Sequence, residues 1–442
     1  MPEIPTAVQT FPTKELFVST LVKDIPLGRA ILDLVDNCVD GATRLRPDGN
    51  FGGLWVRISV KPNQFEIRDN CGGIPLELAV DHAFRFGRPS GMKETPHSVG
   101  QFGVGMKRAF FKLGNVFDVD SKSEHSQFRM HVDVNAWKVQ KDEKGNDDWH
   151  FPLLEAQYAE LSVDQTGTTI VLNELHAAVS SEFGLSNFES RLYEELRTAH
   201  QHSIQTGLKV FLNDHEVLSK ALMLLSSKAI QPAFITLSIN GGARSPVKVK
   251  IYAGITGEER TEFSAAGWYI FCNNRLVLEA DHSRVTGWEE VQFHPRFNRF
   301  RGYTFFDCDD SSRLPWNTTK TGVDTESPVY QAVRLRMVAV MQPVLTFLNG
   351  VARETGSDDP ERPLYSAITR SKMVDISQLP ANKQFLAPEA GPRRRARSPN
   401  VWIRYQKPKD QFERVKDALK ATTQGEVGEK TFDYFYRHEC MD

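Results

Sequence analysis

The sequence predicts an α/β (α+β) protein with two or three domains, and three observations lead to that prediction. Segments with the period of a strand alternate with segments that have the period of an amphipathic helix. The chain has 442 residues, which is enough for two or three domains of ordinary size. Hydrophobic residues make up 40% of the chain and charged residues 25%, as in globular proteins with a substantial core.

The first 175 residues predict a mixed domain of helices and strands. Val56, Ile58 and Val60 alternate with polar residues, and Phe65 and Ile67 continue the same period after a short turn, which indicates a hairpin. The other expected elements are helices over 13–23, 27–45, 76–86 and 105–113, a Gly-, Pro- and Ser-rich loop over 87–103, and strands that run to about residue 175.

A second region begins near residue 176. It is expected to contain a helix over 187–203, strands over 208–212, 233–239, 247–255 and 267–279, and a long helix over 328–350. Residues 351–400 are expected to be a connector with a basic cluster, because they include the run Arg393-Arg394-Arg395-Ala396-Arg397. The segment 401–442 predicts a small β-α-α module with a strand over Val401–Gln406 and helices over 409–420 and 426–438.

Composition indicates a cytoplasmic location. The five cysteines are scattered and form no C-x-x-C pair, as expected of free thiols in a reducing compartment. The first 30 residues contain no pattern of a signal peptide, and no run of apolar residues is long enough to predict a membrane span. The net charge of −2 neither favours nor excludes a nucleic-acid partner.

An acidic stripe lies on the predicted helix over 27–45. Asp33, Asn37 and Asp40 are spaced to share one face, and Asp36 lies beside them, while the flanking residues are apolar. Carboxylates at the edge of a buried helix are costly unless something compensates their charge. A divalent cation with phosphates would do so, with Asn37 as an oxygen ligand for Mg²⁺. The alternative is a solvated acidic face.

Asp69 is a second candidate. It continues the period of Phe65 and Ile67, so it is expected to face the interior, where an unpaired carboxylate is unfavourable. The sequence Cys71-Gly72-Gly73 after it allows a tight turn close to a ligand. An exocyclic amino group such as adenine N6 would be a suitable donor to Asp69. The alternative is an Asp that starts a turn and bonds its own backbone.

A glycine triplet precedes the predicted helix over 105–113. Gly100, Gly103 and Gly105 would leave free N–H groups at the positive end of the helix dipole, where phosphates bind, and Lys107 adds a charge. The segment is neither a Walker A loop nor a Rossmann fingerprint, because Met106 follows the last glycine and no strand immediately precedes it. The alternative is a flexible loop without a ligand.

Together with the segment Thr166-Gly167-Thr168-Thr169-Ile170, these segments resemble the motifs of the GHKL ATPases. That family includes the gyrase B subunit, the ninety-kilodalton heat-shock chaperone, MutL, the MORC ATPases and the histidine kinases. The resemblance covers about residues 20–175, with all four motifs in the family's order. It implies a Bergerat-type α/β sandwich in which Asn37 coordinates Mg²⁺, Asp69 binds adenine, and Thr168 helps to fix Asp69.

The resemblance also implies a lid that hinges at Gly100–Gly105 over the phosphates. The residues then expected to bind ATP are Asn37, Asp40, Asp69, Gly73, Ile74, Gly100, Gln101, Phe102, Gly103, Val104, Gly105, Lys107 and Thr168. Two residues depart from the family pattern. The general base, usually Glu, is the shorter Asp33, and Cys71 replaces the first glycine of the D-x-G-x-G motif.

Two segments of the second region resemble the transducer domain of MutL and MORC proteins. Gly267–Val277 looks like its strand–turn–strand, and Leu314–Lys320 looks like the loop whose lysine reaches the γ-phosphate. Lys320 is therefore expected to act with Asp33 in catalysis and as a sensor of ATP, and the alternative is an ordinary surface lysine. A phospho-acceptor histidine on a dimerisation helix is not recognisable, which argues against a histidine kinase.

The chain from Arg393 onward contains twelve Lys and Arg against eight Asp and Glu. Its expected order of strand, helix and helix loosely resembles a ribbon–helix–helix module, in which Trp402, Arg404 and Gln406 would face DNA. The alternative is a solvated basic linker with a small dimerisation or protein-docking module.

The sequence thus predicts an ATPase of low turnover that acts as a molecular clamp in DNA-related processes. ATP and Mg²⁺ would close the lid over 87–105, and two copies would associate through their N-terminal domains. The alternative is a nucleotide-gated scaffold with negligible ATPase activity that binds DNA or a protein partner. A chaperone is disfavoured, because the long middle and dimerisation domains that it would need are missing.

Overall fold

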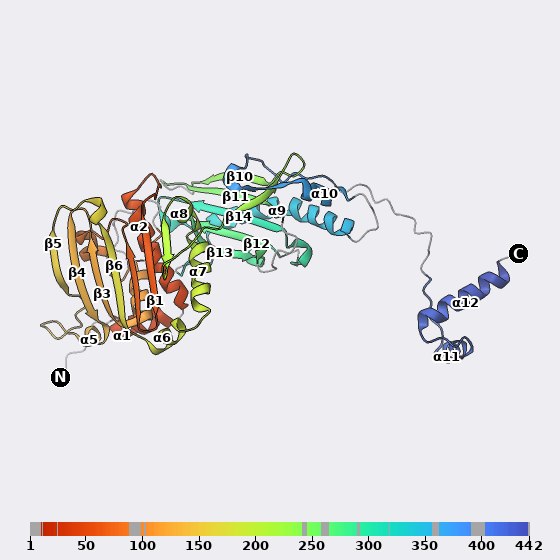
Figure 1. Ribbon diagram of the computed structural model, residues 1–442, viewed down its shortest axis with the longest axis horizontal. Helices are drawn as coiled ribbons and strands as arrows, with labels where there is room; N and C mark the ends of the chain where they lie inside the picture. Colours follow the sequence, from red (N-terminus) through yellow and green to blue (C-terminus); the bar gives the residue numbers. More distant parts are fainter. Residues whose placement is uncertain are drawn as a thin grey trace, which may run out of the picture. The chain divides into compact units, whose positions relative to one another are not determined.

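The structure is a computed structural model that describes residues 10, 12–23, 25–87, 99–100, 103–240, 245–257, 265–289, 292–317, 319–355, 362–389 and 403–440. The chain divides into two compact units, Met1–Ala390 and Gly391–Asp442. In the described residues, the first unit contains two large sheets with helices packed on each and one separate pair of strands, and the second unit contains two helices (Figure 1). The α/β prediction is therefore confirmed.

The N-terminal sheet has eight strands in the order β5-β4-β3-β6-β2-β1-β7-β8. All neighbouring pairs are antiparallel except β1 and β7, which run parallel. The strands are β1 Trp55–Lys61, β2 Gln64–Asp69, β3 Gly114–Lys122, β4 Ser126–Asp133, β5 Leu153–Tyr158, β6 Gly167–Leu175, β7 Lys209–Leu212 and β8 His215–Glu216. The predicted hairpin is confirmed as the pair β1–β2.

The helices of this part of the chain are α1 Lys14–Lys23, α2 Leu27–Leu45, α3 Leu76–Leu78, α4 Gly105–Leu113, α5 Val134–Val139, α6 Ala177–Phe183, α7 Phe188–Ala199 and α8 Gln201–Gln205. The helix expected over 76–86 is instead one α-helical turn followed by a π-helical segment, Ala79–Ala83. The helix expected over 187–203 is interrupted at His200, which separates α7 from α8.

Helix α2 packs against α4, and both share one core with the sheet. Ile31, Leu34 and Val35 of α2 are fully buried, as are Val56 and Phe65 of the sheet, because the strands point every second residue toward the helices. The acidic stripe of α2 is buried as well. The solvated acidic face that the sequence left open is therefore excluded for α2.

The second sheet has five strands in the order β10-β11-β14-β12-β13. They are β10 Ala233–Ile239, β11 Val247–Ile255, β12 Gly267–Cys272, β13 Arg275–Asp281 and β14 Phe300–Asp307, and a separate pair joins β9 Met223–Ser226 to β15 Lys372–Asp375. The predicted strand–turn–strand is the hairpin β12–β13. Its turn residues Asn273 and Asn274 both have positive φ, which asparagine tolerates in a two-residue hairpin turn.

Helix α9, Pro328–Thr355, packs on β11 and β14, and α10, Pro363–Arg370, packs on α9. Within the described residues, Pro328–Glu354 is the one segment long and apolar enough to cross a membrane, but half of its apolar window is buried in the second core. Helix α10 and strand β15 lie within residues 351–400, which we expected to be a connector. Helix α10 forms because Leu364, Ala367 and Ile368 bury an apolar face against α9, and β15 forms because it pairs with β9.

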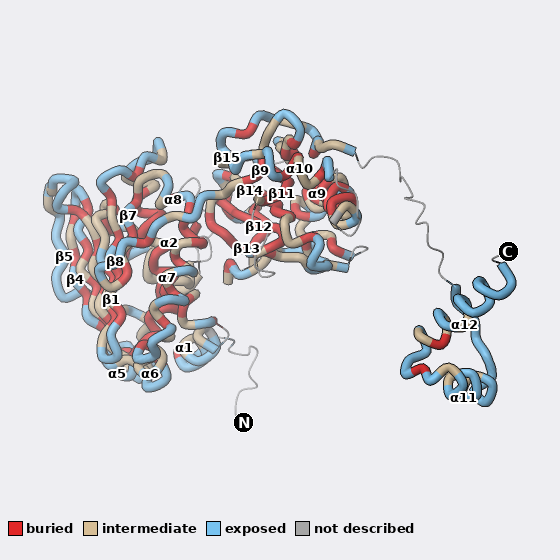
Figure 2. Tube along the Cα trace, turned by 45° about the vertical axis from the view of Figure 1, so that its right-hand side comes forward, coloured by how far each residue is buried: buried red, intermediate tan, exposed pale blue. Residues whose placement is uncertain are grey.

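The second unit contains α11, Lys409–Ala418, and α12, Gln424–Glu439, as the sequence predicted. Figure 2 shows both helices largely exposed, and Ala421 and Val427 are its buried residues among those described. The strand expected over Val401–Gln406 is wrong for residues 403–406, which are irregular. A strand is stable only when another strand pairs with it, and none is described in this unit. Arg404 and Gln406 therefore do not lie on the DNA-facing strand that the ribbon–helix–helix resemblance implied, and Trp402 lies outside the described residues.

We expect Trp268→Ala to destabilise the first unit by about 3–5 kcal/mol, because Trp268 is fully buried at the centre of the second core. The measurement is chemical denaturation followed by circular dichroism. Tyr158→Ala is the matched control, because its aromatic ring is 69% exposed, and it should change stability little. An equal loss in both variants would contradict the description of this core.

Candidate functional site

The four sequence motifs meet around helix α2. Asp69, at the end of β2, pairs with Thr168 at the start of β6. The thiol of Cys38 on α2 donates to Asp69 Oδ2 at 3.4 Å, and Asp40, two residues later on the same helix, accepts from the backbone N–H groups of Val99 and Gly100 at 2.7 and 2.8 Å. One buried helix therefore contacts the other three motifs or their direct neighbours.

Asp69 is a carboxylate held in an apolar setting. Burial raises its pKa to about 6, although the N–H of Cys71 donates to it at 2.8 Å and favours the charged form. Burial also raises the pKa of the Cys38 thiol well above its ordinary value, so Cys38 acts as a hydrogen-bond donor here. The Cys38 thiol and the backbone N–H groups of Cys71 and Thr168 donate to this carboxylate. Because an ionised carboxylate has about four acceptor sites, it can accept one more hydrogen bond from a ligand.

Two glycines allow the chain to approach itself closely around Asp69. A Cβ atom on Gly167 would lie 2.0 Å from the carbonyl oxygen of Asp69, and one on Gly73 would lie 2.0 Å from that of Lys122. Gly73 also has φ +65°, a conformation that disfavours side chains. Glycine at 167 therefore allows the start of β6 to fit against the end of β2, and glycine at 73 allows the turn after β2 to fit against the end of β3.

A short chain of hydrogen bonds links Thr168 to the turn after β2. The hydroxyl oxygens of Thr168 and Ser121 lie 3.0 Å apart, and Ser121 accepts from the N–H of Ile74 at 2.8 Å. All three residues belong to the wall next to Asp69. Ser121 was not singled out in the sequence, because a serine within a strand pattern carries no signal of its own.

Helix α4 begins at Gly105, with Val104 as its N-cap and Gly103 at φ +64° before it. Lys107 is 1% exposed and donates to the carbonyl oxygens of Ala83, at 2.9 Å, and Gly103. Burial lowers its pKa to about 7. Lys107 therefore ties the start of α4 to the π-helical segment. Gln101 and Phe102, the other predicted members of this segment, lie outside the described residues.

Asp33 lies against the first turn of α4. A Cβ atom on Gly105 would be 3.2 Å from Asp33 Cγ, so the helix terminus and the carboxylate are in direct contact. The Arg108 guanidinium donates to Asp33 Oδ2 at 2.6 Å, and both side chains are buried. Asp33 is therefore paired with an arginine three residues into the helix.

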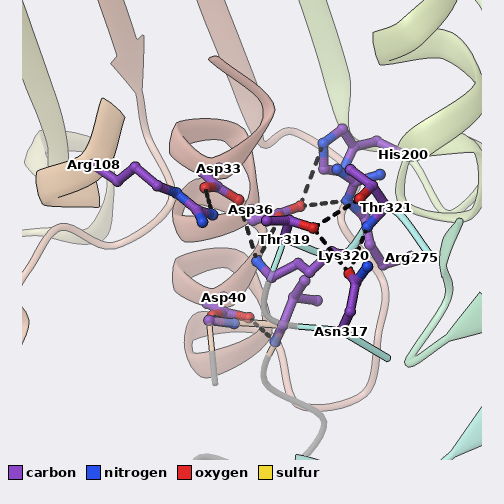
Figure 3. Close-up of polar contacts among 12 residues, drawn as sticks. Asp33, Asp36, Asp40, Arg108, His200, Arg275, Asn317, Thr319, Lys320 and Thr321 are labelled. Atoms are coloured by element: carbon purple, nitrogen blue, oxygen red, sulfur yellow. Dashed lines mark hydrogen bonds and ion pairs between the residues drawn. The ribbon is translucent and has the colours of Figure 1, made fainter. Parts of the chain in front are cut away.

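Asp36 is fully buried and receives cations from the second region of the chain. Arg275, at the tip of the β12–β13 hairpin, donates to Oδ1 at 2.8 Å, and Lys320 donates to Oδ2 at 2.6 Å (Figure 3). Burial opposes ionisation of Asp36, but these charges outweigh it and hold its pKa well below the usual range. His200 lies 3.6 Å from Oδ1, and burial lowers its pKa to about 3, so its ring is neutral.

The loop around Lys320 is built to project this side chain. Asn317 Oδ1 accepts from Thr319 Oγ1 at 3.1 Å and from the N–H of Thr321 at 3.0 Å. Lys320 itself has φ +53°, an unfavourable conformation for a residue with a side chain. Its ammonium lies 3.7 Å from Asp33 Oδ1 as well. Lys320 is 5% exposed, which excludes the alternative of an ordinary surface lysine.

Residues 25–168 match the sequence model of a family described as histidine kinase-, DNA gyrase B- and HSP90-like ATPases. This part of the chain belongs to the GHKL ATPase family. None of the curated proteins compared with the chain gives a significant match. The family match supports ATP binding by this part of the chain, which we call the GHKL domain. Its large mixed sheet and the helices packed on that sheet fit the α/β sandwich of the family.

The residues of the GHKL domain fit a magnesium ion at Asn37. The Nδ2 atom of Asn37 is buried and has no hydrogen-bond partner in the described part of the chain. The oxygen and nitrogen ends of such an amide are assigned from their contacts, so either end can occupy this position. An unsatisfied amide beside Asp33 and Asp36 can present its oxygen to a cation that also binds phosphate oxygens. Within the described residues, no cluster of three His, Cys, Asp or Glu side chains could hold a metal by itself. Asn37 would therefore hold Mg²⁺ together with the nucleotide.

The GHKL motifs identified most of the residues that α2 brings together, but two arginines and one neutral histidine were missed. Arg108 follows Lys107 directly, so its short distance along the chain from the glycine triplet could have indicated that it belongs to the site. Arg275 and His200 carried no signal, because their partner Asp36 is more than 150 residues away in the sequence.

We expect Asp36→Asn to destabilise the protein by about 3–5 kcal/mol, because it leaves Arg275 and Lys320 buried without a counter-charge. Since the folded-state pKa of Asp36 is lowered, its contribution is present above about pH 4 and is lost as the pH falls further. Urea denaturation at pH 7 and pH 3 measures both effects. Asp214→Asn is the control, because its ion pair with Arg57 is exposed. A loss of stability no larger than that of the control would contradict this account.

Proposed function

We propose that this protein is an ATP-driven switch that binds Mg²⁺-ATP in the GHKL domain and hydrolyses it slowly. The observation that carries the proposal is the contact between Lys320 and α2: its ammonium lies 2.6 Å from Asp36 and 3.7 Å from Asp33. A lysine from the second region thus lies beside the residues that the family motifs assign to the triphosphate. Such a lysine can detect whether a terminal phosphate is present.

ATP recognition is divided among the described motif residues. Asp69 accepts from the amino group of adenine, and Thr168 supports Asp69 through the adjoining strand. The glycines at 100, 103 and 105 and the N-terminus of α4 offer N–H groups to the phosphates. Asn37 holds Mg²⁺, which neutralises phosphate charge when bound.

Hydrolysis requires a water molecule aligned with the terminal phosphate. Asp33 is the carboxylate nearest to the start of α4, so we assign it the orientation of that water. Lys320 supplies positive charge where negative charge develops, and it does so in a setting from which bulk water is excluded. Slow turnover is expected, because Asp33 is short and is already paired with Arg108.

The switch would act as a molecular clamp. Binding of ATP would close the segment over 87–105, of which 88–98, 101 and 102 lie outside the described residues. Two copies would then associate through their N-terminal domains, and the transducer-like second region would transmit the state through Lys320. We propose a cytoplasmic role in a DNA-related process, in which the second unit, with its basic connector, contacts DNA or a protein partner. The five free cysteines are in keeping with a reducing compartment.

A second candidate function is a nucleotide-gated scaffold that binds ATP without appreciable hydrolysis. The ion pair between Asp33 and Arg108 favours this candidate, because a carboxylate engaged at 2.6 Å by a guanidinium is a poor acceptor for a proton from water. Binding of ATP would then make the scaffold associate with its partner, and dissociation of ATP, rather than hydrolysis, would release that partner.

Titration calorimetry and single-turnover hydrolysis test the two candidates together. Asn37→Ala is expected to lower ATP affinity about tenfold or more and to abolish turnover. Asp33→Ala is expected to bind ATP but to lose turnover by about a hundredfold or more. Equal turnover in wild type and Asp33→Ala would remove Asp33 from the mechanism. No hydrolysis by the wild type, together with a size change on adding a non-hydrolysable analogue, would identify the scaffold.

The pKa of about 6 at Asp69 predicts that ATP affinity depends on pH. The ionised carboxylate accepts from adenine, so affinity is constant above about pH 7 and falls below pH 6, by up to about tenfold per pH unit, as Asp69 becomes protonated. Titrations between pH 5 and pH 8 measure this dependence. Asp69→Asn should bind weakly at every pH, whereas Asn37→Ala should retain the same pH profile at lower affinity. A flat profile in the wild type would contradict the role of Asp69.

A further inference from the structure

A row of five buried charges joins the GHKL domain to the second region. In order they are Arg108, Asp33, Lys320, Asp36 and Arg275, and each contacts the next (Figure 3). Each of these side chains is at most 7% exposed. The row contains three cations and two carboxylates, so it carries one excess positive charge away from solvent. An uncompensated buried charge is unfavourable, and a bound anion would remove that cost.

Arg108, at one end of the row, has hydrogen-bonding capacity that is not used. Its side chain is buried, and its Nε atom has no hydrogen-bond partner among the residues that the structure describes. A guanidinium can donate five hydrogen bonds and matches phosphate or carboxylate oxygens with two parallel bonds. Asp33 uses one of its terminal nitrogens, and the Nε side of the fork is left without an acceptor. The neighbouring Lys107 cannot take this role, since its ammonium already binds two carbonyl groups.

The surroundings of Arg108 are also suited to an anion. Arg108 lies in the first turn of α4, a nine-residue helix whose N-terminal end carries partial positive charge. Asp33 is packed directly on that end at Gly105. The carboxylate therefore lies between two cations, with Arg108 at 2.6 Å on one side and Lys320 at 3.7 Å on the other. Asn37, one helical turn from Asp33, has an unpartnered amide nitrogen.

We propose that Arg108 and Lys320 form an anion clamp that Asp33 occupies in the absence of nucleotide and that the terminal phosphate of ATP takes over when it binds. The phosphate carries more negative charge than a carboxylate and offers more acceptor oxygens, so it competes effectively for both cations. Asp33 is thereby released to orient water only when a triphosphate is present. Arg108 is then a phosphate-binding residue that distinguishes ATP from ADP. This inference rests on the proposed function, because it concerns the same site.

The first test compares ATP and ADP affinity in full-length wild type, Arg108→Gln and Arg108→Lys by titration calorimetry with Mg²⁺. Arg108→Gln is expected to weaken ATP binding about tenfold or more and to change ADP binding less than about twofold. Arg108→Lys should recover part of the loss, because it keeps the charge but not the fork. Lys112→Gln removes a positive charge from the same helix outside the row, and it should bind both nucleotides as the wild type does.

A second variant separates binding from misfolding. Asp33→Asn removes the competing charge from the clamp, so ATP should bind more tightly than to the wild type, by several-fold, while ADP affinity stays the same. A purely structural ion pair would have the opposite effect, because its loss would weaken binding of both nucleotides. The double variant Asp33→Asn with Arg108→Gln keeps the net charge of the row at that of the wild type, so it should retain the thermal unfolding temperature of the wild type more closely than Asp33→Asn alone.

The outcomes distinguish this inference from the proposed function. A wild type that binds neither nucleotide contradicts the proposed function itself. A wild type that binds ATP, with Arg108→Gln weakening ATP and ADP equally or not at all, overturns the anion clamp alone. Weaker ATP binding by Asp33→Asn than by the wild type overturns it as well.

Discussion

The buried carboxylate of Asp36 is the interaction on which the arrangement of the first unit depends. It lies on the central helix of the GHKL domain and receives Arg275 and Lys320, both from the second region. Charges at this depth are stable only as a pair, so removing either side leaves an unpaired ion. The contact therefore holds the second region against the helix that carries the first nucleotide motif, with Asp33 and Asn37. A change in charge at Asp36 therefore also changes the electrostatic environment of Arg275 and Lys320 in the second region.

Desolvation explains the chemistry of the site in a consistent way. It raises the pKa of Asp69 and lowers those of Lys107 and His200, and it is overcome only at Asp36, where two cations are in direct contact. Asp69 is thus prepared for a neutral donor such as an amino group. The row from Arg108 to Arg275 is instead prepared for a change in negative charge. Under the proposed function, Asp69 would bind the adenine end of ATP and the row of charges would bind its phosphates.

The second unit is different in character, because it has almost no core of its own. Its two helices were predictable, since α11 and α12 are long and contain clear periodic patterns. The strand expected before them was not formed in the described residues, because a strand depends on pairing that a local pattern cannot supply. Four aromatic side chains of α12 are exposed (Phe432, Tyr434, Phe435 and Tyr436), so most of its apolar surface is not used within the unit.

The sequence by itself determined the elements and motifs that depend on neighbouring residues. The helix that carries Asp33 and Asn37, the hairpin that ends at Asp69 and the helix after Gly103 were all predicted, because periodicity, glycine positions and turn chemistry are local properties. Only the tertiary structure decided which charges meet. Arg275 and Lys320 lie 239 and 284 residues from Asp36 along the chain, and nothing in a local pattern specifies such a pair. Long-range electrostatic contacts are set by how two cores pack, and that packing exists only in the folded chain.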